Sequence, residues 1–444
     1  MSQTDSSNQN TPIERMSRPF LNFLHIEAAG GVVLLVCTAI ALILANSPWA
    51  QIYIDFWKLP IAISFSDFKL SLSLSHWIND GLMTIFFFVV GLEIKRELID
   101  GELKNRQAAM LPIIAAVGGM VIPALFYTLN IRGNEGATAW GIPMATDIAF
   151  VVGFLSLFGK RVPHGLKIFV LSLAIVDDLG AILIIAAVYS KSISIGALTL
   201  GFLGLGIVAL LNRLGVRRVP VYVFVGGLIW LAFLTSGVHP TIAGVLLGLL
   251  TPASAWIGDR TFIDVLSALT DRWMSSGATK PPDNRNHVNH LISTARETVS
   301  PLERLEVTLH PWVAFFIMPV FALANAGVPL AAHAISAPIS IAVTSGLFLG
   351  KPLGILLFSW LAVRFFGGRL PEKVSWSSML GAGFLAGIGF TMSIFIASLA
   401  LDGDLLVEGK VGTLLGSSLS AIIGLGILYF VLPRLHNVVP KKRQ

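Results

Sequence analysis

The stretch LAIVDDLGAI, residues 173–182, places two adjacent carboxylates in a segment that is otherwise apolar from Ile168 to Tyr189. At about 1.5 Å per residue, a helix of this length crosses a hydrocarbon core of about 30 Å. A charged side chain at that depth costs about 3 kcal/mol on insertion scales, so it points to function by default. Asp177 and Asp178 are therefore the first candidates for a functional site. The alternative is that lysines of neighbouring helices neutralise the pair, which then serves assembly alone.

The composition indicates a polytopic membrane protein. Of the 444 residues, 55% are hydrophobic and only 13% are charged, far fewer charges than a soluble domain of this size carries. The net charge of +6 would suit a nucleic-acid binder, but the positions of the basic residues favour a membrane topology and no nucleic-acid partner. No spacing of His and Cys resembles a metal site. We therefore expect no cofactor.

Apolar segments that can span a membrane recur along the chain. The fold class that we expect is an all-α polytopic membrane protein with twelve transmembrane helices. They lie at residues 28–46, 76–98, 108–129, 137–158, 166–189, 195–211, 219–234, 238–250, 305–326, 339–363, 377–401 and 411–432. The apolar run 219–257 is too long for one helix, and it is divided at Gly237–Pro240.

The basic residues orient these helices. With twelve spans both termini lie on one side, and 25 of the 31 basic residues fall in the connections on that side. The positive-inside rule makes this side cytoplasmic. We expect a cytoplasmic segment at 1–26, a transmembrane domain at 27–433 with a long cytoplasmic loop at about 251–300, and a basic cytoplasmic tail at 434–444. Lys351 stands alone in the middle of the tenth helix.

A different pattern occupies residues 61–74. Apolar and polar residues alternate in FKLSLSL, residues 68–74, after a turn at Ser66–Asp67. This period of two predicts a β-hairpin outside the membrane, on the extracytoplasmic side. The edge of such a hairpin can pair with a second copy of the chain.

Three acids and one lysine share the predicted membrane interior: Asp147, Asp177, Asp178 and Lys351. Adjacent residues of a helix point about 100° apart, so Asp177 and Asp178 face different directions. One of them can pair with Lys351 while the other faces a water-filled cavity. Burial drives all such groups toward neutrality, which suits them to exchange protons.

Two of the predicted helices carry signals for an interruption. Pro143 removes a helix hydrogen bond, and Thr146 or Asp147 can cap the helix that follows. The segment GIGFTMS at 387–393 is a second candidate, although its glycines also fit a packing seam. Interrupted helices in the two halves of a transporter indicate an ion site at the midplane. Where two such helices cross, an aspartate offsets the N-terminal dipoles and a lysine the C-terminal ones, and Asp147 and Lys351 have these signs.

Glu93, Arg96 and Glu97 form a charged group at the cytoplasmic end of the second helix. Glu93 and Glu97 lie on one face, four residues apart. They are explained equally well as ordinary interface charges or as a funnel that attracts cations.

Five segments resemble the NhaA family of sodium/proton antiporters. They are FVVGLEIKREL at 88–98, ATDIA at 145–149, DDLGA at 177–181, GKPLG at 350–354 and GIGFTMSI at 387–394. The resemblance extends from about Arg18 to Leu432. It implies a location in the cell inner membrane, inverted-topology repeats of helices three to five and ten to twelve, and helices four and eleven as two crossed discontinuous helices.

The resemblance also implies roles for single residues. Asp178 corresponds to the central carrier of Na⁺ and protons, Asp177 to the acid associated with Lys351, and Thr146 to a polar group near the ion. Asp147 and Lys351 correspond to the charge compensators of the crossing. Glu93, Arg96, Glu97 and Glu306 resemble a cytoplasmic pH-sensing cluster, and the hairpin resembles the family's dimer contact.

These observations predict an electrogenic secondary antiporter that exports Na⁺ or Li⁺ in exchange for protons, by alternating access, for sodium and pH homeostasis. The expected partners are these ions, the bilayer and a second copy of the chain. The main alternative is a sodium-coupled symporter of organic anions on a related fold. An intramembrane aspartyl protease needs two facing carboxylates, whereas Asp177 and Asp178 diverge. A passive cation channel is disfavoured by the lone Lys351.

Overall fold

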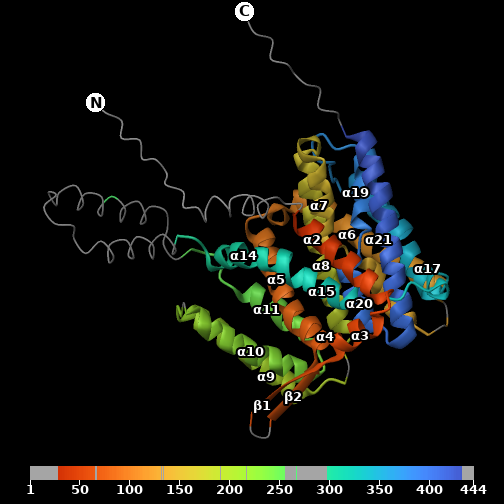
Figure 1. The fold of residues 1–444 in the computed structure, drawn as a ribbon. Helices are drawn as coiled ribbons and strands as arrows, with labels where there is room; N and C mark the ends of the chain where they lie inside the picture. Colours follow the sequence, from red (N-terminus) through yellow and green to blue (C-terminus); the bar gives the residue numbers. More distant parts are fainter. Residues whose placement is uncertain are drawn as a thin grey trace, which may run out of the picture. The chain divides into compact units, whose positions relative to one another are not determined.

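The computed structural model of the protein describes residues 29–65, 68–131, 133, 135–190, 192–216, 218–255, 267 and 298–432 (Figure 1). The predicted segment at 1–26, most of the loop at 251–300 and the tail at 434–444 lie outside the described residues. The chain divides into two compact units. Unit 1 comprises Met1–Ser75, Met110–Ala181 and Ala314–Gln444, and unit 2 comprises His76–Ala109 and Ile182–Val313.

The described chain is an all-α membrane protein with one small hairpin. Eight of its helical stretches are long and apolar enough to cross a membrane, or ten when each of two bent pairs is counted as one span. The predicted helices at 76–98 and 238–250 contain shorter α-helices, α5 (Met83–Ile99) and α11 (Thr241–Leu250). In front of α5 the chain forms a π-helix, η1 (Trp77–Leu82).

Unit 1 holds most of the helices in the described residues. They are α2 (Ala29–Ala45), α3 (Ala50–Lys58), α6 (Arg106–Asn130), η3 (Ala137–Met144), α7 (Ile148–Leu157), η4 (Gly159–Arg161), α8 (His164–Val188), α15 (Met318–Asn325), α16 (Ala332–Ile335), α17 (Pro338–Ser345), η6 (Gly346–Gly350), α18 (Lys351–Phe365), α19 (Trp376–Ala386), α20 (Phe390–Ala400) and α21 (Gly403–Val431). Helices α6 and α8 and the short elements α4 (Leu74–His76) and η5 (Val313–Ile317) cross the boundaries between the units.

The alternating segment of the sequence forms two antiparallel strands, β1 (Pro60–Phe65) and β2 (Phe68–Ser73). Ile61 pairs with Leu72 in this hairpin, so the apolar residues of the two strands stand opposite each other. The strands cover most of the range 61–74 predicted from the period of two, and β1 begins one residue before it, at Pro60. The position of the hairpin outside the membrane and its role between two copies stay predictions.

Helix α3 is absent from the expectations based on sequence, because its nine residues are too few to span a membrane. It is bent by 113° from α2. The Asn46 side chain, in the corner between them, donates to the Val328 carbonyl at 2.9 Å and accepts from the Leu330 N–H at 2.8 Å. The corner is thereby fixed to the loop that follows α15.

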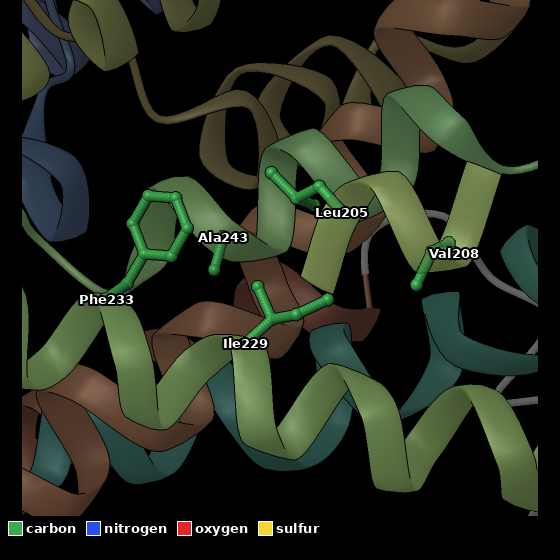
Figure 2. Packing of buried hydrophobic residues seen from close by; sticks show 5 residues of the cluster. All are labelled: Leu205, Val208, Ile229, Phe233 and Ala243. Atoms are coloured by element: carbon green, nitrogen blue, oxygen red, sulfur yellow. The ribbon is translucent and has the colours of Figure 1, made fainter. Parts of the chain in front are cut away.

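Unit 2 contains η1, α5, η2 (Glu102–Lys104), α9 (Ile195–Arg213), α10 (Val219–Ser236), α11 and α14 (Pro301–Trp312). Leu205 and Val208 of α9, Ile229 and Phe233 of α10 and Ala243 of α11 are buried together. Figure 2 shows these side chains where the three helices meet. The close approach of apolar side chains holds the helices together where lipid provides little hydrophobic driving force.

Helices α5 and α11 approach each other at glycines. A Cβ on Gly91 of α5 would lie 2.6 Å from the Val245 carbonyl oxygen of α11, closer than any side chain allows. Small residues at such positions let two helix backbones touch, which is the usual packing of helices in membranes.

Two helical stretches of unit 1 are interrupted. The first changes from η3 to α7 across Ala145–Asp147, and the second changes from α19 to α20 across Gly387–Gly389 with a bend of 44°. The N–H of Asp147 donates to the carbonyl of Ile388 at 2.7 Å. The two interruptions are therefore in direct contact, although they are separated by more than two hundred residues of sequence.

Candidate functional site

The four charged residues that the sequence places inside the membrane, and Thr146 beside them, all belong to unit 1. Asp177 and Asp178 lie in the middle of α8, with 0% and 3% of their surface exposed. Thr146 and Asp147 stand in the first interruption, and Lys351 is the first residue of α18. All five side chains are buried.

The carboxylate of Asp177 uses its two oxygens differently. Oδ2 accepts hydrogen bonds from Lys351 Nζ at 2.6 Å and from Thr146 Oγ1 at 2.8 Å. Oδ1 is buried and has no hydrogen-bond partner among the described residues. Since a carboxylate oxygen has two lone pairs to satisfy, Asp177 retains the capacity to bind a further donor or a cation.

Lys351 joins α8 to the first interruption. Its ammonium group forms the ion pair with Asp177 and also donates to the carbonyl oxygen of Met144, the last residue of η3. A buried charge needs both an opposite charge and hydrogen bonds to offset its lost hydration. Lys351 obtains both, and its positive charge lies against the carbonyl end of a helical segment, where the dipole is negative.

Thr146 plays a corresponding part for the second interruption. Its hydroxyl lies 2.8 Å from Asp177 Oδ2 and 2.9 Å from the carbonyl oxygen of Ala386, the last residue of α19. The final carbonyls of a helix have no partner within the helix. The hydroxyl has a single hydrogen, so Thr146 shares it between the end of α19 and the acid of α8.

Asp147 lies at two helix N-termini. It is the N-cap of α7, where Oδ1 accepts from the Phe150 N–H at 3.5 Å. Its Oδ2 accepts from the Thr391 N–H of α20 at 3.0 Å and from the Thr391 hydroxyl. Helix N-termini carry a partial positive charge, so a carboxylate is favoured at this position.

The signs of these contacts form a consistent pattern. A carboxylate faces the starts of α7 and α20, while an ammonium group and a hydroxyl donate to the ends of η3 and α19. The carboxylate is that of Asp147 and the ammonium group that of Lys351, and their role as compensators of a helix crossing stays a prediction. The contact between Thr146 and Ala386 adds a neutral donor that the sequence does not reveal.

Asp178 is adjacent to Asp177 and about 100° away around α8. The ion pair with Lys351 is made by Asp177. Helix geometry alone leaves the choice between the two acids open, and the resemblance implies Asp177, which is the acid that Lys351 contacts. Chemically, the arrangement offers buried carboxylate oxygens, which are suitable ligands for a small hard cation and also for protons.

The second group of candidates belongs to unit 2. Arg96 of α5 forms an ion pair with Glu306 of α14, and Glu306 Oε2 is buried without a hydrogen-bond partner among the described residues. Glu97 Oε1 accepts from the backbone N–H of Glu102 at 3.0 Å and so stabilises the turn after α5. Glu93 is half-buried on the same helix. The structure thus brings Arg96 and Glu306 together and gives Glu97 a structural contact.

Two residues of the site are not singled out by the sequence. Thr391 lies within the GIGFTMS segment, but its bond to Asp147 depends on the contact between two distant interruptions. Ser417 of α21 accepts a hydrogen bond from the Phe390 N–H at 3.1 Å. The signal for Ser417 is weak, since it is one of several small residues in GTLLGSSLS, residues 412–420.

Comparison with known proteins gives a consistent result. The family described as Na⁺/H⁺ antiporter 1 matches residues 21–428. The Na⁺/H⁺ antiporter NhaA of Rhodopirellula baltica is 51% identical over 423 residues, which cover 95% of this chain and 96% of the relative. The NhaA protein of Rhizobium meliloti is 47% identical over 413 residues, which cover 93% of this chain and 94% of the relative. NhaA 2 of Vibrio vulnificus is 45% identical over 419 residues, covering 94% of each.

Proposed function

Because the chain belongs to the NhaA family of Na⁺/H⁺ antiporters, we propose that Asp177 and Asp178 of α8 are the residues at which Na⁺ and protons compete. The protein is a multi-pass bacterial membrane protein that exchanges Na⁺ for H⁺. It is a transporter and not an enzyme.

The observation that carries the proposal is the unequal use of the Asp177 carboxylate. Lys351 and Thr146 share Oδ2, whereas Oδ1 is buried without a hydrogen-bond partner among the described residues. An oxygen of this kind, on a residue that is followed in α8 by a second buried acid, supports a cation site at Asp177 and Asp178. Thr146 supplies a polar oxygen beside them.

The charge of Asp177 is already balanced by Lys351. Asp178 does not take part in this ion pair, and in this proposal it is the group that carries either Na⁺ or a proton. An empty site with an unbalanced charge is costly to move through a low-dielectric membrane. This cost disfavours reorientation of the empty carrier and couples the two ion fluxes.

The site becomes accessible to each side of the membrane in turn when one helix bundle moves against another. If more protons than sodium ions move in each cycle, the exchange is electrogenic, and the membrane potential drives Na⁺ export. Li⁺ is a second exported ion in this proposal, because it is also a small hard cation.

The finer architecture belongs to the same proposal. It comprises twelve transmembrane helices with inverted-topology repeats, in which the interrupted stretches η3–α7 and α19–α20 are two crossed discontinuous helices. Asp147 and Lys351 compensate the dipoles at the crossing. The contacts of Asp147 with α7 and α20, and of Lys351 with η3, support these roles.

Location and assembly complete the proposal. The chain lies in the cell inner membrane with both termini in the cytoplasm, as the distribution of basic residues suggests. Two copies associate through the β1–β2 hairpin, whose edge is suited to strand pairing. Glu93, Arg96, Glu97 and Glu306 act as a pH-sensing cluster, with the Arg96–Glu306 ion pair as the observation in its favour.

Exchange in reconstituted liposomes tests the site. Liposomes with an acidic interior and a dye that reports the pH difference receive Na⁺, Li⁺ or K⁺, with Asp178→Asn beside the wild type. We expect Na⁺ and Li⁺ to collapse the pH difference in the wild type, K⁺ to have little effect, and Asp178→Asn to be inactive. If liposomes with Asp178→Asn still lose their pH difference when Na⁺ is added, the carrier is a residue other than Asp178. An unchanged pH difference in the wild type would favour the organic-anion symporter.

A further inference from the structure

Different residues accept hydrogen bonds from the first two backbone N–H groups of α20. The Thr391 N–H is bound by Asp147, as described above. The preceding N–H, of Phe390, is bound by the hydroxyl oxygen of Ser417 at 3.1 Å. The N-cap residue of α20, Gly389, has no side chain to accept either of them. Ser417 therefore performs part of the capping that a side chain at Gly389 would otherwise perform.

Ser417 belongs to neither interrupted stretch. It lies on α21, 27 residues after Phe390, with 4% of its surface exposed. A buried N–H group without an acceptor is strongly unfavourable, and lipid and apolar side chains provide none. The position of α21 thus determines whether the first N–H of α20 is satisfied.

The backbone in this region has little freedom to find another acceptor. A Cβ on Gly387 would lie 2.5 Å from the Leu347 carbonyl oxygen and 2.7 Å from Ser420 Oγ. The interruption therefore packs tightly against the backbone of η6 and against the Ser420 side chain of α21. A displacement that gave the Phe390 N–H a new partner would have to move these neighbours as well.

A continuous chain of contacts connects Ser417 with the proposed cation site. Phe390 is followed by Thr391, which is bound by Asp147. Asp147 is preceded by Thr146, which donates to Asp177. Each step is a hydrogen bond or a covalent bond between buried residues, so a change at Ser417 is transmitted without passing through solvent.

We propose that Ser417 is a positioning residue for transport, which holds the start of α20 in place and offsets its positive N-terminal dipole. This inference rests on the proposed site at Asp177 and Asp178. Without the Ser417 oxygen, the Phe390 N–H adds uncompensated positive potential beside Asp147. Na⁺ and H⁺ are both cations, so both bind less tightly at the neighbouring carboxylates.

Because the added potential is positive, its expected effect on the transport kinetics is specific. At alkaline pH, where protons no longer compete, we expect Ser417→Ala to raise the KM for Na⁺ about fivefold, from the usual effect of a helix terminus on a nearby charge. At low Na⁺, the pH of half-maximal exchange falls by about 0.7 unit, because the site also releases its proton more readily. A defect that only lowers the amount of folded protein changes the maximal rate and leaves both quantities unaltered.

The experiment measures Na⁺-dependent and pH-dependent exchange in proteoliposomes for four variants. Ser417→Ala removes the acceptor, and Ser417→Thr restores a hydroxyl and should return the KM toward the wild-type value. Ser420→Ala is the matched control, because it removes a buried hydroxyl one turn further along α21 that, within the described part of the chain, makes only a long hydrogen bond of 3.5 Å to the Leu347 carbonyl. Asp178→Asn tests the carrier itself.

The outcomes separate the two proposals. An unchanged KM and pH profile in Ser417→Ala, together with an inactive Asp178→Asn, would overturn the role of Ser417 and leave the carrier intact. Equal effects of Ser417→Ala and Ser420→Ala would also overturn it, since they would indicate general loosening of α21. Exchange by Asp178→Asn would overturn the assignment of Asp178 as the carrier. The shift in the KM for Na⁺ caused by Ser417→Ala would still be measurable.

Discussion

The ammonium nitrogen of Lys351 lies 2.6 Å from Oδ2 of Asp177, and both side chains are completely buried. Neither charge has solvent as an alternative partner. Breaking a buried ion pair from one side leaves the other charge uncompensated, whereas replacing both partners by neutral groups is often well tolerated. This asymmetry makes the pair directly testable.

Lys351→Met should lower the free energy of unfolding by about 3–5 kcal/mol, because Asp177 then remains buried without its counter-charge. The double variant Lys351→Met with Asp177→Asn should recover most of this loss. Thermal and chemical unfolding in detergent measure both. A double variant as unstable as the sum of the two single variants would show that the residues do not act as a pair.

Asp147 is predicted to be important for stability through its two helix N-termini. Asp147→Ala should cost about 3 kcal/mol, since it removes an N-cap and leaves the Thr391 N–H unpaired. Asp147→Asn keeps one acceptor oxygen and should cost about half as much. The measurement is again unfolding in detergent.

Asp402 offers the matched control for Asp147. It is the N-cap residue of α21, it is exposed, and its side chain makes no capping hydrogen bond. Asp402→Ala should therefore change the stability by less than about 0.5 kcal/mol. Similar losses at Asp147 and Asp402 would mean that the contacts of Asp147 with α7 and α20 contribute little.

The ion pair between Arg96 and Glu306 should contribute less than the pair in unit 1. The Arg96 side chain is 49% exposed, so solvent screens the interaction. Arg96→Gln is expected to cost about 1 kcal/mol or less. If the pair takes part in pH sensing, each single variant should alter the pH dependence of exchange, and the exchanged pair Arg96→Glu with Glu306→Arg should restore it. A normal pH profile in the single variants would leave the pair a structural contact between α5 and α14.

Local patterns of the sequence point to Asp177 and Asp178 but do not say which of them pairs with Lys351, because both are adjacent acids in one apolar helix. Only the resemblance to the family distinguishes the two acids. Which of the two acids Lys351 pairs with depends on how α8 and α18 are rotated about their axes, and no local sequence pattern encodes that rotation. The interruptions are better predicted, since Pro143 and the glycines near Gly387 act on their own backbone.

Contacts that depend on tertiary packing could not be predicted. The hydroxyl of Thr146 donates to Ala386, and that of Ser417 accepts from Phe390, across long separations in sequence. Helix α3 is missed for a different reason, because a short amphipathic helix lacks the apolar length by which membrane spans are recognised. The hairpin at β1–β2 is found because a period of two is a local signal.

The burial of His239 predicts that the stability of unit 2 depends on pH. It lies in the turn between α10 and α11, where Nδ1 is 2.9 Å from Thr241 Oγ1 and Nε2 is 3.6 Å from the carboxylate of Asp80. Only 11% of its side chain is exposed, and this burial lowers the pKa of His239 from 6.5 to about 4. The imidazole is therefore neutral in the folded protein at pH 7.

The sign of the effect follows from this lowered pKa. Below pH 6.5 the unfolded chain takes up a proton at His239 that the folded protein does not, so the folded state loses stability as the pH falls from about 6.5 to about 4. His239→Gln should reduce this loss by up to about 3 kcal/mol. Other groups titrate over the same range, so the relevant quantity is the difference between the wild type and His239→Gln in unfolding at pH 7 and pH 4.5. A wild type that is stabilised by acid relative to His239→Gln would show that the charged imidazole pairs with Asp80 and that this attraction outweighs burial.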